Sequence, residues 1–160
     1  MNNHLRVAGT LIMQQYAYAN TTGGKLRGSI KDRTYIFKGI PYGATTAGTA
    51  RFMAPRKAAP WPGARDALQF GPACPQLDIA SMQFGDEIAQ LMQGGLDERT
   101  VAYSEDCLVL NLWTMGLRDN VKRPVMVWCH GGRFAEGSGA GEWCDGAALA
   151  RRGDVVIVTV

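Results

Sequence analysis

The sequence predicts an α/β fold in which an antiparallel hairpin leads into a mostly parallel central sheet. Short alternating runs at 25–30 and 34–37 flank a polar turn, a pattern typical of a β-hairpin. Two later runs, 125–129 and 155–160, are apolar without alternation, as in strands that are buried on both faces. The helical pattern at 145–152 between them indicates a strand–helix–strand unit with a right-handed crossover.

The remaining segments are predicted to be one further strand and several irregular connections. Residues 107–114 form a clear strand, with a charged turn after it. The helix is expected to have Asp145 as its N-cap and to stop at Gly153. The other segments are, in order, a hairpin end at Pro41, an irregular stretch at 44–63, one short strand or helical turn at 65–72, and a surface excursion at 76–103 that is closed at its base.

Length and composition fit one domain with a substantial core. The chain has 160 residues, of which 46% are hydrophobic, and its formal net charge is +3. Lysine and arginine are scattered rather than gathered in a basic stripe with aromatic residues, so no nucleic-acid partner is expected. No apolar run approaches the roughly 20 residues that a membrane-spanning helix needs, so no membrane span is expected.

Residues 1–20 have two interpretations, a secretory signal peptide or a disordered extension outside the domain. A polar start is followed by a short apolar stretch at 7–13 and by Ala-Tyr-Ala at 17–19, which resembles a cleavage site. The apolar stretch is at the lower limit of about 7 residues for a signal, so both interpretations stay open. The domain itself is expected at 21–160. The signal-like start favours an extracellular or periplasmic location and leaves the cytoplasm as the alternative.

The strand at 125–129 runs directly into a His-Gly-Gly sequence at 130–132, where the chain must turn sharply and the two glycines leave the backbone without side chains. A hydrophobic strand that ends in paired glycines is how α/β enzymes aim backbone N–H groups at a reacting atom. A plain strand-to-loop turn is one alternative, and a phosphate-binding loop, which lacks its Gly-x-Gly-x-x-Gly spacing, is another. A zinc site at Cys129, His130 and Cys144 would lack a fourth ligand, so no metal is expected.

Six short motifs follow one another along the chain. They are Gly-Ile-Pro-Tyr-Gly at 39–43, Arg-Phe at 51–52, Phe-Gly-Pro-Ala-Cys-Pro-Gln at 70–76, Ser-Glu-Asp-Cys-Leu-Val-Leu-Asn at 104–111, His-Gly-Gly-Arg-Phe at 130–134 and Asp-Gly at 145–146. Together and in this order they resemble the N-terminal part of the type B carboxylesterases, a family that includes cholinesterases and bacterial para-nitrobenzyl esterases. The likeness runs from about residue 21 to residue 160.

This resemblance implies an incomplete α/β-hydrolase fold and a carboxylic ester hydrolase with a Ser–His–acid triad. The family's nucleophile lies in a Gly-x-Ser-x-Gly elbow beyond the strand at 155–160, and no such motif occurs in these residues. The intact protein is therefore expected to be a serine esterase that acts on small-molecule carboxylic esters without a cofactor, and this chain alone is expected to be inactive. The alternatives are a non-catalytic fragment and an adhesion or partner-binding relative of the same fold.

The resemblance also assigns roles within the glycine motif. The backbone N–H groups of Gly132 and Arg133 match the family's oxyanion-hole donors, and Gly131 supplies the turn. Arg133 replaces a third glycine, so its N–H serves only if its φ suits a side chain. His130 and Phe134 are expected to be structural, His130 as a hydrogen-bonding residue beneath the loop rather than a catalyst.

Two residue pairs match structural contacts of the family. Cys74 and Cys107 match a disulfide, which for a loop of about 30 residues is expected to stabilise by about 3–4 kcal/mol; in a reducing cytosol both remain thiols. Arg51 and Glu105 match a buried ion pair, with two solvated charges as the alternative. Cys129 is expected to be a small core residue.

The strand at 125–129 is expected to leave an open sheet edge. In this fold that strand normally pairs with the nucleophile strand, which is not among these residues, and an apolar strand with an open edge is a template for aggregation. Self-association through this edge is therefore expected. Because Val160 is expected in the core, the domain is also expected to continue beyond it.

Overall fold

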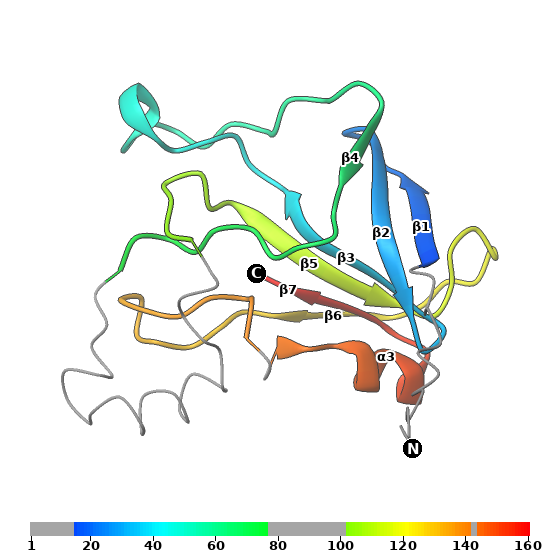
Figure 1. Cartoon of the computed structure of the whole chain (residues 1–160). Coiled ribbons are helices and arrows are strands. Elements are labelled where there is room, and N and C mark those ends of the chain that lie inside the picture. The colour runs from blue at the N-terminus through cyan, green and yellow to red at the C-terminus, as the bar shows by residue number, and fades with distance from the viewer. Residues whose placement is uncertain (1–14, 77–101, 142–143) are drawn as a thin grey trace, which may run out of the picture.

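The computed structural model describes residues 15–76, 102–141 and 144–160, which form a single seven-stranded sheet (Figure 1). The hydrogen-bonded order is β1-β2-β3-β5-β7-β6, and β4 pairs with β2. The elements are β1 Gln15–Asn20, β2 Lys25–Lys31, β3 Thr34–Pro41, the 3-10 helix η1 Gly48–Ala50, β4 Ala64–Asp66, β5 Val109–Thr114, β6 Val125–Trp128, α3 Ala147–Gly153 and β7 Val156–Thr159. No helix in these ranges is long and apolar enough to cross a bilayer.

The predicted hairpin is confirmed as the antiparallel pair β2–β3. Its two turn residues, Asp32 and Arg33, both have positive φ, 49° and 61°, as a tight two-residue hairpin turn requires. The second strand continues past the predicted end at residue 37. The register with β5 shifts between Phe37 and Ile40, where Gly39 has a φ of 68°. This irregularity carries β3 to the edge of the sheet where the candidate site lies.

The first strand of the sheet begins at Gln15, before the expected domain start at residue 21. All six residues of β1 pair with β2, with Ala17 buried and Tyr16 and Tyr18 exposed. The Ala-Tyr-Ala sequence that resembles a cleavage site is thus also the alternating pattern of a strand with small residues inward. The rest of the expected extension, residues 1–14, lies outside the described residues.

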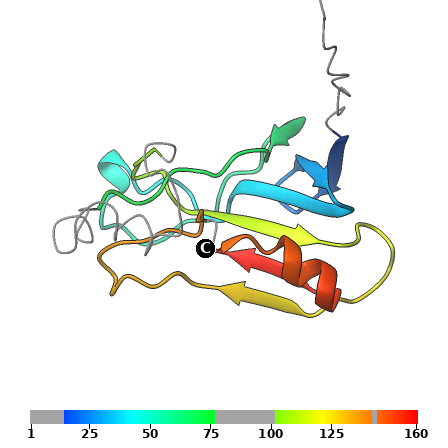
Figure 2. The same ribbon diagram turned by 60° about the horizontal axis from the view of Figure 1, so that its bottom comes forward.

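The predicted strand–helix–strand unit is confirmed, because β6 and β7 are parallel and α3 connects them. Figure 2 shows α3 lying along one face of the sheet beside β7. The N-cap of α3 is Gly146, so the prediction that Asp145 takes this place is wrong by one residue, although the carboxylate of Asp145 accepts the N–H of Ala147 at 2.8 Å. The helix reaches Gly153, and the left-handed residue after it is Asp154, whose carboxylate binds Arg123.

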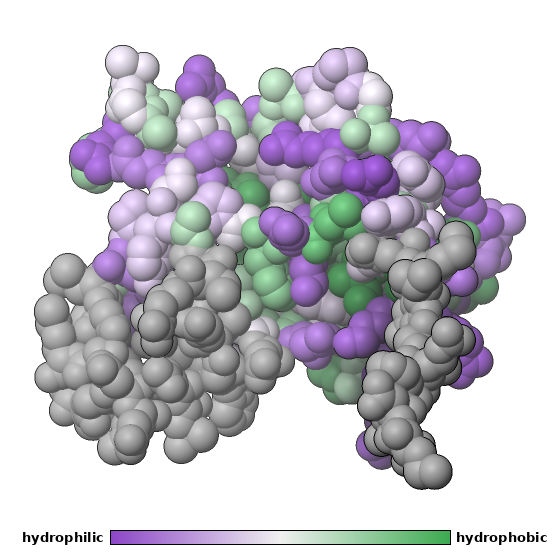
Figure 3. All heavy atoms as spheres, viewed as in Figure 1, coloured by the Kyte–Doolittle hydropathy of each residue, from purple (hydrophilic) through white to green (hydrophobic). Residues whose placement is uncertain are grey.

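The prediction that the strand at 125–129 is buried on both faces is wrong. Among the described residues β6 pairs with β7 alone, and its side chains are 52–60% exposed. Among the described elements the short helix α3 packs against β3, β5 and β7 rather than against β6. In Figure 3 apolar residues gather in the middle of the face that it shows, over the strands, and polar residues surround them.

The excursion predicted at 76–103 is closed at its base, as expected. A bridge joins Ala73 to Tyr103, and the Ala73 N–H and C=O bond to Ala102 and Ser104. The interior of the excursion lies outside the described residues. Because β6 and β7 end at the same edge of the sheet where β5 begins, this base faces the loop that follows β6.

Candidate functional site

The glycine loop, defined here as residues 130–141, leaves the carboxyl end of β6 in a tight turn. The N–H groups of Ala135 and Glu136 both donate to the Gly132 carbonyl oxygen, at 2.9 and 3.2 Å. Gly132 has a φ of 98°, and a Cβ at this position would lie 1.9 Å from the Glu136 carbonyl oxygen. The turn therefore requires glycine at 132 for its conformation and for space.

The backbone N–H groups of Gly132 and Arg133 donate no hydrogen bond to any residue that the structure describes. Arg133 and Phe134 have φ values of 56° and 63°, in the left-handed region that side chains rarely adopt. Holding such a residue there costs about 1–3 kcal/mol, which the two bonds to the Gly132 carbonyl help to offset. Both side chains point into solvent, and Phe134 is fully exposed. Both amides thus lack a partner among the described residues, and Arg133 has a φ that suits glycine better than a side chain.

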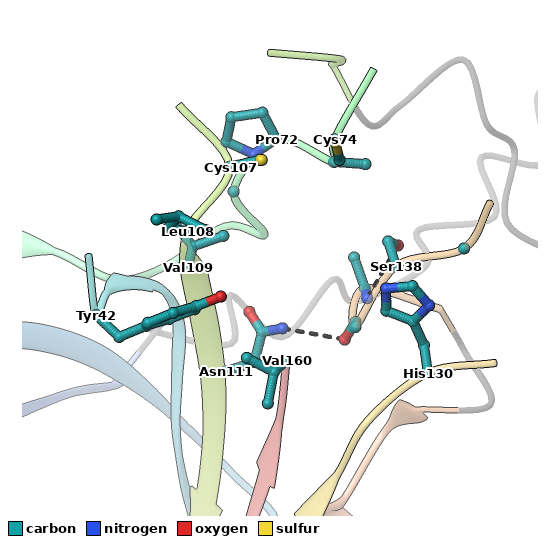
Figure 4. A pocket seen from close by; sticks show the side chains of 15 residues that line it. Tyr42, Pro72, Cys74, Cys107, Leu108, Val109, Asn111, His130, Ser138 and Val160 are labelled. Carbon is teal, nitrogen blue, oxygen red and sulfur yellow. Dashed lines mark hydrogen bonds between the residues drawn. The ribbon is translucent and has the colours of Figure 1, made fainter. Parts of the chain in front are cut away.

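A cavity of about 240 Å³ lies beside this loop, between the strand ends (Figure 4). Tyr42, Leu108 and Val160 line one part of it, and His130 and Ser138 line another. The loop lines it through His130 and residues 137–140, and residues 131–133 are not part of its wall. Burial raises the pKa of the Tyr42 hydroxyl, so this group is a neutral hydrogen-bonding partner for a ligand at physiological pH.

His130 is an exposed residue at the start of the loop, and its Nδ1–H donates to the carbonyl oxygen of Gly131 at 2.7 Å. A Cβ on Gly137 would lie 2.5 Å from the same nitrogen, so the imidazole fills the space between the two arms of the loop. With Nδ1 acting as a donor, the ring is tied to the turn, and Nε2 keeps the free lone pair of the imidazole.

Two side-chain amides that the sequence did not single out hold the loop. Gln76 binds Gly137 in both directions: its Nε2 donates to the carbonyl oxygen at 3.0 Å, and its Oε1 accepts the N–H at 2.5 Å. Asn111, buried in β5, donates through Nδ2 to the Gly139 carbonyl oxygen and to the Thr159 hydroxyl, both at 3.0 Å. An asparagine in an otherwise apolar strand is a signal for such a site, because buried amides need partners.

The expected disulfide is not formed in the structure, where Cys74 and Cys107 are free thiols. Both line the cavity at the base of the excursion. Burial, and then the neighbouring Cys74 thiol, raise the pKa of Cys107. The pair is thus placed as the resemblance implies, in its reduced form.

We expect mild oxidation to join Cys74 to Cys107 and to raise the free energy of unfolding by about 3–4 kcal/mol. The thiolate is the reactive form, and the raised pKa of Cys107 keeps this group a thiol at neutral pH. The rate of bond formation should therefore increase as the pH rises toward that pKa. Thiol titration and peptide mass mapping measure the bond, with Cys74→Ala as the control. Four titratable thiols after oxidation would contradict the assignment.

Arg51 and Glu105 form an ion pair, as the resemblance implies, but the expectation that it is buried is wrong. The Arg51 side chain is 61% exposed and the Glu105 side chain 28% exposed. Arg51 follows η1 in the irregular stretch, which lies on the surface and does not bury the ion pair. A pair with this exposure contributes about 0–1 kcal/mol, so it joins the two segments with little effect on stability.

Cys129 is exposed at the end of the edge strand, so the prediction that it is a core residue is wrong. Like the residues of β6, it lies outside the part of the sheet against which α3 packs. Cys144 is half-buried, and its thiol donates to the Ser138 carbonyl oxygen at 3.8 Å. Within residues 15–76, 102–141 and 144–160 no group of three or more potential ligands is placed to hold a metal ion.

A hairpin leading into an α/β sheet, with a glycine turn at the strand ends, defines the N-terminal part of an α/β-hydrolase. The carboxylesterase family matches residues 15–160, and the chain belongs to this family. It is 39% identical over 142 residues to phenmedipham hydrolase of Pseudarthrobacter oxydans, a match that covers 89% of this chain and 27% of the relative. It is 35% identical over 141 residues to para-nitrobenzyl esterase of Bacillus subtilis (strain 168), covering 88% of this chain and 26% of the relative.

The solved structures lead to the same family. A carboxylesterase of Geobacillus stearothermophilus superposes with a TM-score of 0.71 at 37% identity, covering 89% of this chain and 25% of that one. The chain thus spans about a quarter of the length of the relatives that it matches.

Proposed function

We propose that this chain supplies the scaffold and the oxyanion hole of a serine carboxylesterase. The observation that carries the proposal is the pair of amides at Gly132 and Arg133, which donate to no described residue and lie on a turn at the carboxyl edge of the sheet. No Gly-x-Ser-x-Gly sequence occurs in the 160 residues. The attacking serine is therefore assigned to polypeptide that follows Val160 in the intact protein.

The reaction follows from this assignment. The serine attacks the ester carbonyl carbon, and the carbonyl oxygen becomes an oxyanion that accepts the N–H groups of Gly132 and Arg133. Collapse of the tetrahedral intermediate breaks the bond to the alcohol, which leaves, and water then attacks the acyl-enzyme to release the acid. We assign the general base, like the serine, to polypeptide that follows Val160, and His130 a supporting role in the glycine loop, because His130 does not match the position of the family's catalytic histidine.

The test is to express the complete reading frame and to measure hydrolysis of para-nitrophenyl butyrate. We expect a burst of para-nitrophenol equal to the enzyme concentration, followed by steady turnover, whereas the 160-residue chain alone gives no burst. Loss of the burst on replacing the elbow serine with alanine identifies the nucleophile. A complete protein with no burst and another residue in place of that serine would refute the esterase and favour the partner-binding alternative.

We further propose export from the cytoplasm, with cleavage before Gln15. Cleavage within the Ala-Tyr-Ala sequence would remove part of β1 and leave the edge of β2 that pairs with it without its partner. N-terminal sequencing of the mature protein checks this, and an N-terminus inside β1 would contradict it.

We expect the 160-residue chain to self-associate through the free edge of β6. Its four apolar residues present unpaired backbone groups and side chains that are more than half exposed. Val127→Lys should weaken the association by placing a charge on this edge, whereas Val121→Lys, at an exposed valine outside the strand, should leave it unchanged. Sedimentation velocity measures both. A wild-type chain that stays monomeric at micromolar concentration would contradict the prediction.

A further inference from the structure

We propose that Gln76 is a positioning residue for the oxyanion hole, an inference that rests on the proposed esterase function. Its side-chain amide pairs with both the N–H and the C=O of Gly137, as a neighbouring strand would. The same Nε2 also donates to the Cys74 carbonyl oxygen at 3.0 Å, so the amide is tied to its own segment at the base of the excursion. Gln76 therefore connects this base to the glycine loop.

Gly137 is packed against the turn that carries the two donors. Its φ is 108°, and a Cβ on it would lie 2.5 Å from His130 Nδ1 and 2.9 Å from the Gly131 carbonyl oxygen. The residue before it, Glu136, donates its N–H to the Gly132 carbonyl oxygen. Fixing Gly137 thus fixes Gly131 from one side and Gly132 from the other. Loss of the Gln76 hydrogen bonds would therefore displace the backbone N–H groups of Gly132 and Arg133 through the loop itself, without movement of a helix or strand.

The far end of the loop has a separate anchor. The Gly139 carbonyl oxygen accepts hydrogen bonds from Asn111 at 3.0 Å and from the Thr159 hydroxyl at 2.7 Å. Asn111 and Thr159 are both buried in the sheet, so their replacement would also disturb the core. Gln76 is only half-buried, so its contribution to the loop is measurable without unfolding the protein.

The expected consequence is a lower rate with unchanged substrate binding. The oxyanion interaction forms fully only in the transition state, so displaced donors reduce kcat more than they change KM. A displacement of about 1 Å can cost about 100-fold in rate. For Gln76→Met, which keeps the length of the side chain and removes its donor and acceptor, we expect kcat to fall about 10- to 100-fold.

The experiment uses the complete protein and compares Gln76→Met with Gln69→Met, a control at an exposed glutamine seven positions earlier on the same segment. The readouts are kcat and KM on para-nitrophenyl butyrate per titrated active site, affinity for a trifluoromethyl ketone, and hydrogen exchange at the Gly137 amide. For Gln76→Met we expect the ketone to bind more weakly by the same factor as kcat falls, and Gly137 to exchange faster. Gln69→Met should match the wild type.

The outcomes separate this inference from the proposed function. A wild-type esterase whose Gln76→Met variant keeps its kcat and its affinity for the ketone overturns the role of Gln76 alone. A loss of activity explained entirely by fewer titrated active sites also overturns it, because that is the effect of lower stability. A wild-type protein that hydrolyses no ester overturns both.

Discussion

Replacing Gly132 with alanine is expected to lower kcat of the complete esterase by about 100- to 1,000-fold, the usual effect of losing one oxyanion donor. A Cβ at this position would meet the Glu136 carbonyl oxygen at 1.9 Å, and the φ of 98° disfavours any side chain. The turn must open to relieve that contact, which moves the N–H of Gly132 and of Arg133 away from the oxyanion. Steady-state kinetics on para-nitrophenyl butyrate measure the effect.

The matched control is Gly63→Ala. Gly63 also has a positive φ, 68°, but a Cβ there meets no atom within 4 Å. This variant therefore carries the backbone strain of a left-handed alanine far from the glycine loop, and its kcat should equal that of the wild type. If Gly132→Ala retained more than about a tenth of the wild-type kcat with its fold intact, the assignment of the oxyanion donors would be wrong.

Local patterns predicted those parts of the fold that depend on local interactions. The turn at Asp32 and Arg33 follows from adjacent residues, and the parallel pair β6–β7 follows from the strand–helix–strand pattern of one continuous segment. Burial depends on what covers a strand, and apolar composition alone cannot supply that information. The exposed β6 shows this limit, since its residues have the composition of a core strand but lie beyond the reach of α3.

The candidate site also combines local features that the sequence predicts with contacts between distant segments that it does not. The paired glycines mark the turn in the sequence because only glycine fits such a backbone, and Gly132 has the positive φ that this implies. The side chains that hold the turn come from distant segments: Gln76 lies 61 positions before Gly137, and Asn111 lies 28 positions before Gly139. Such contacts are set by the sheet order, so no local pattern could have assigned Gln76 to the loop.

Trp113→Ala is expected to lower the free energy of unfolding by about 3–5 kcal/mol, the usual cost of removing a fully buried aromatic side chain. Trp113 is 0% exposed and packs with Ile36, Ala150 and Ile157, so it joins β3, β5, β7 and α3 in one cluster. Its indole Nε1–H is buried without a hydrogen-bond partner in the described part of the chain. Trp113→Phe removes that unpaired donor, so we expect it to cost less than the alanine variant.

Denaturant unfolding of the complete protein measures these differences, with Leu149→Ala as the control. Leu149 lies on α3 but is 53% exposed, so its truncation keeps the helix and removes little buried area. We expect the control to change stability by less than about 1 kcal/mol. A Trp113→Ala variant no less stable than Leu149→Ala would show that the cluster at Trp113 does not hold α3 to the sheet. The position of α3 would then have to depend on other contacts, such as the ion pair between Arg123 and Asp154. The same contacts would then hold the β6–α3–β7 connection, which includes the glycine loop.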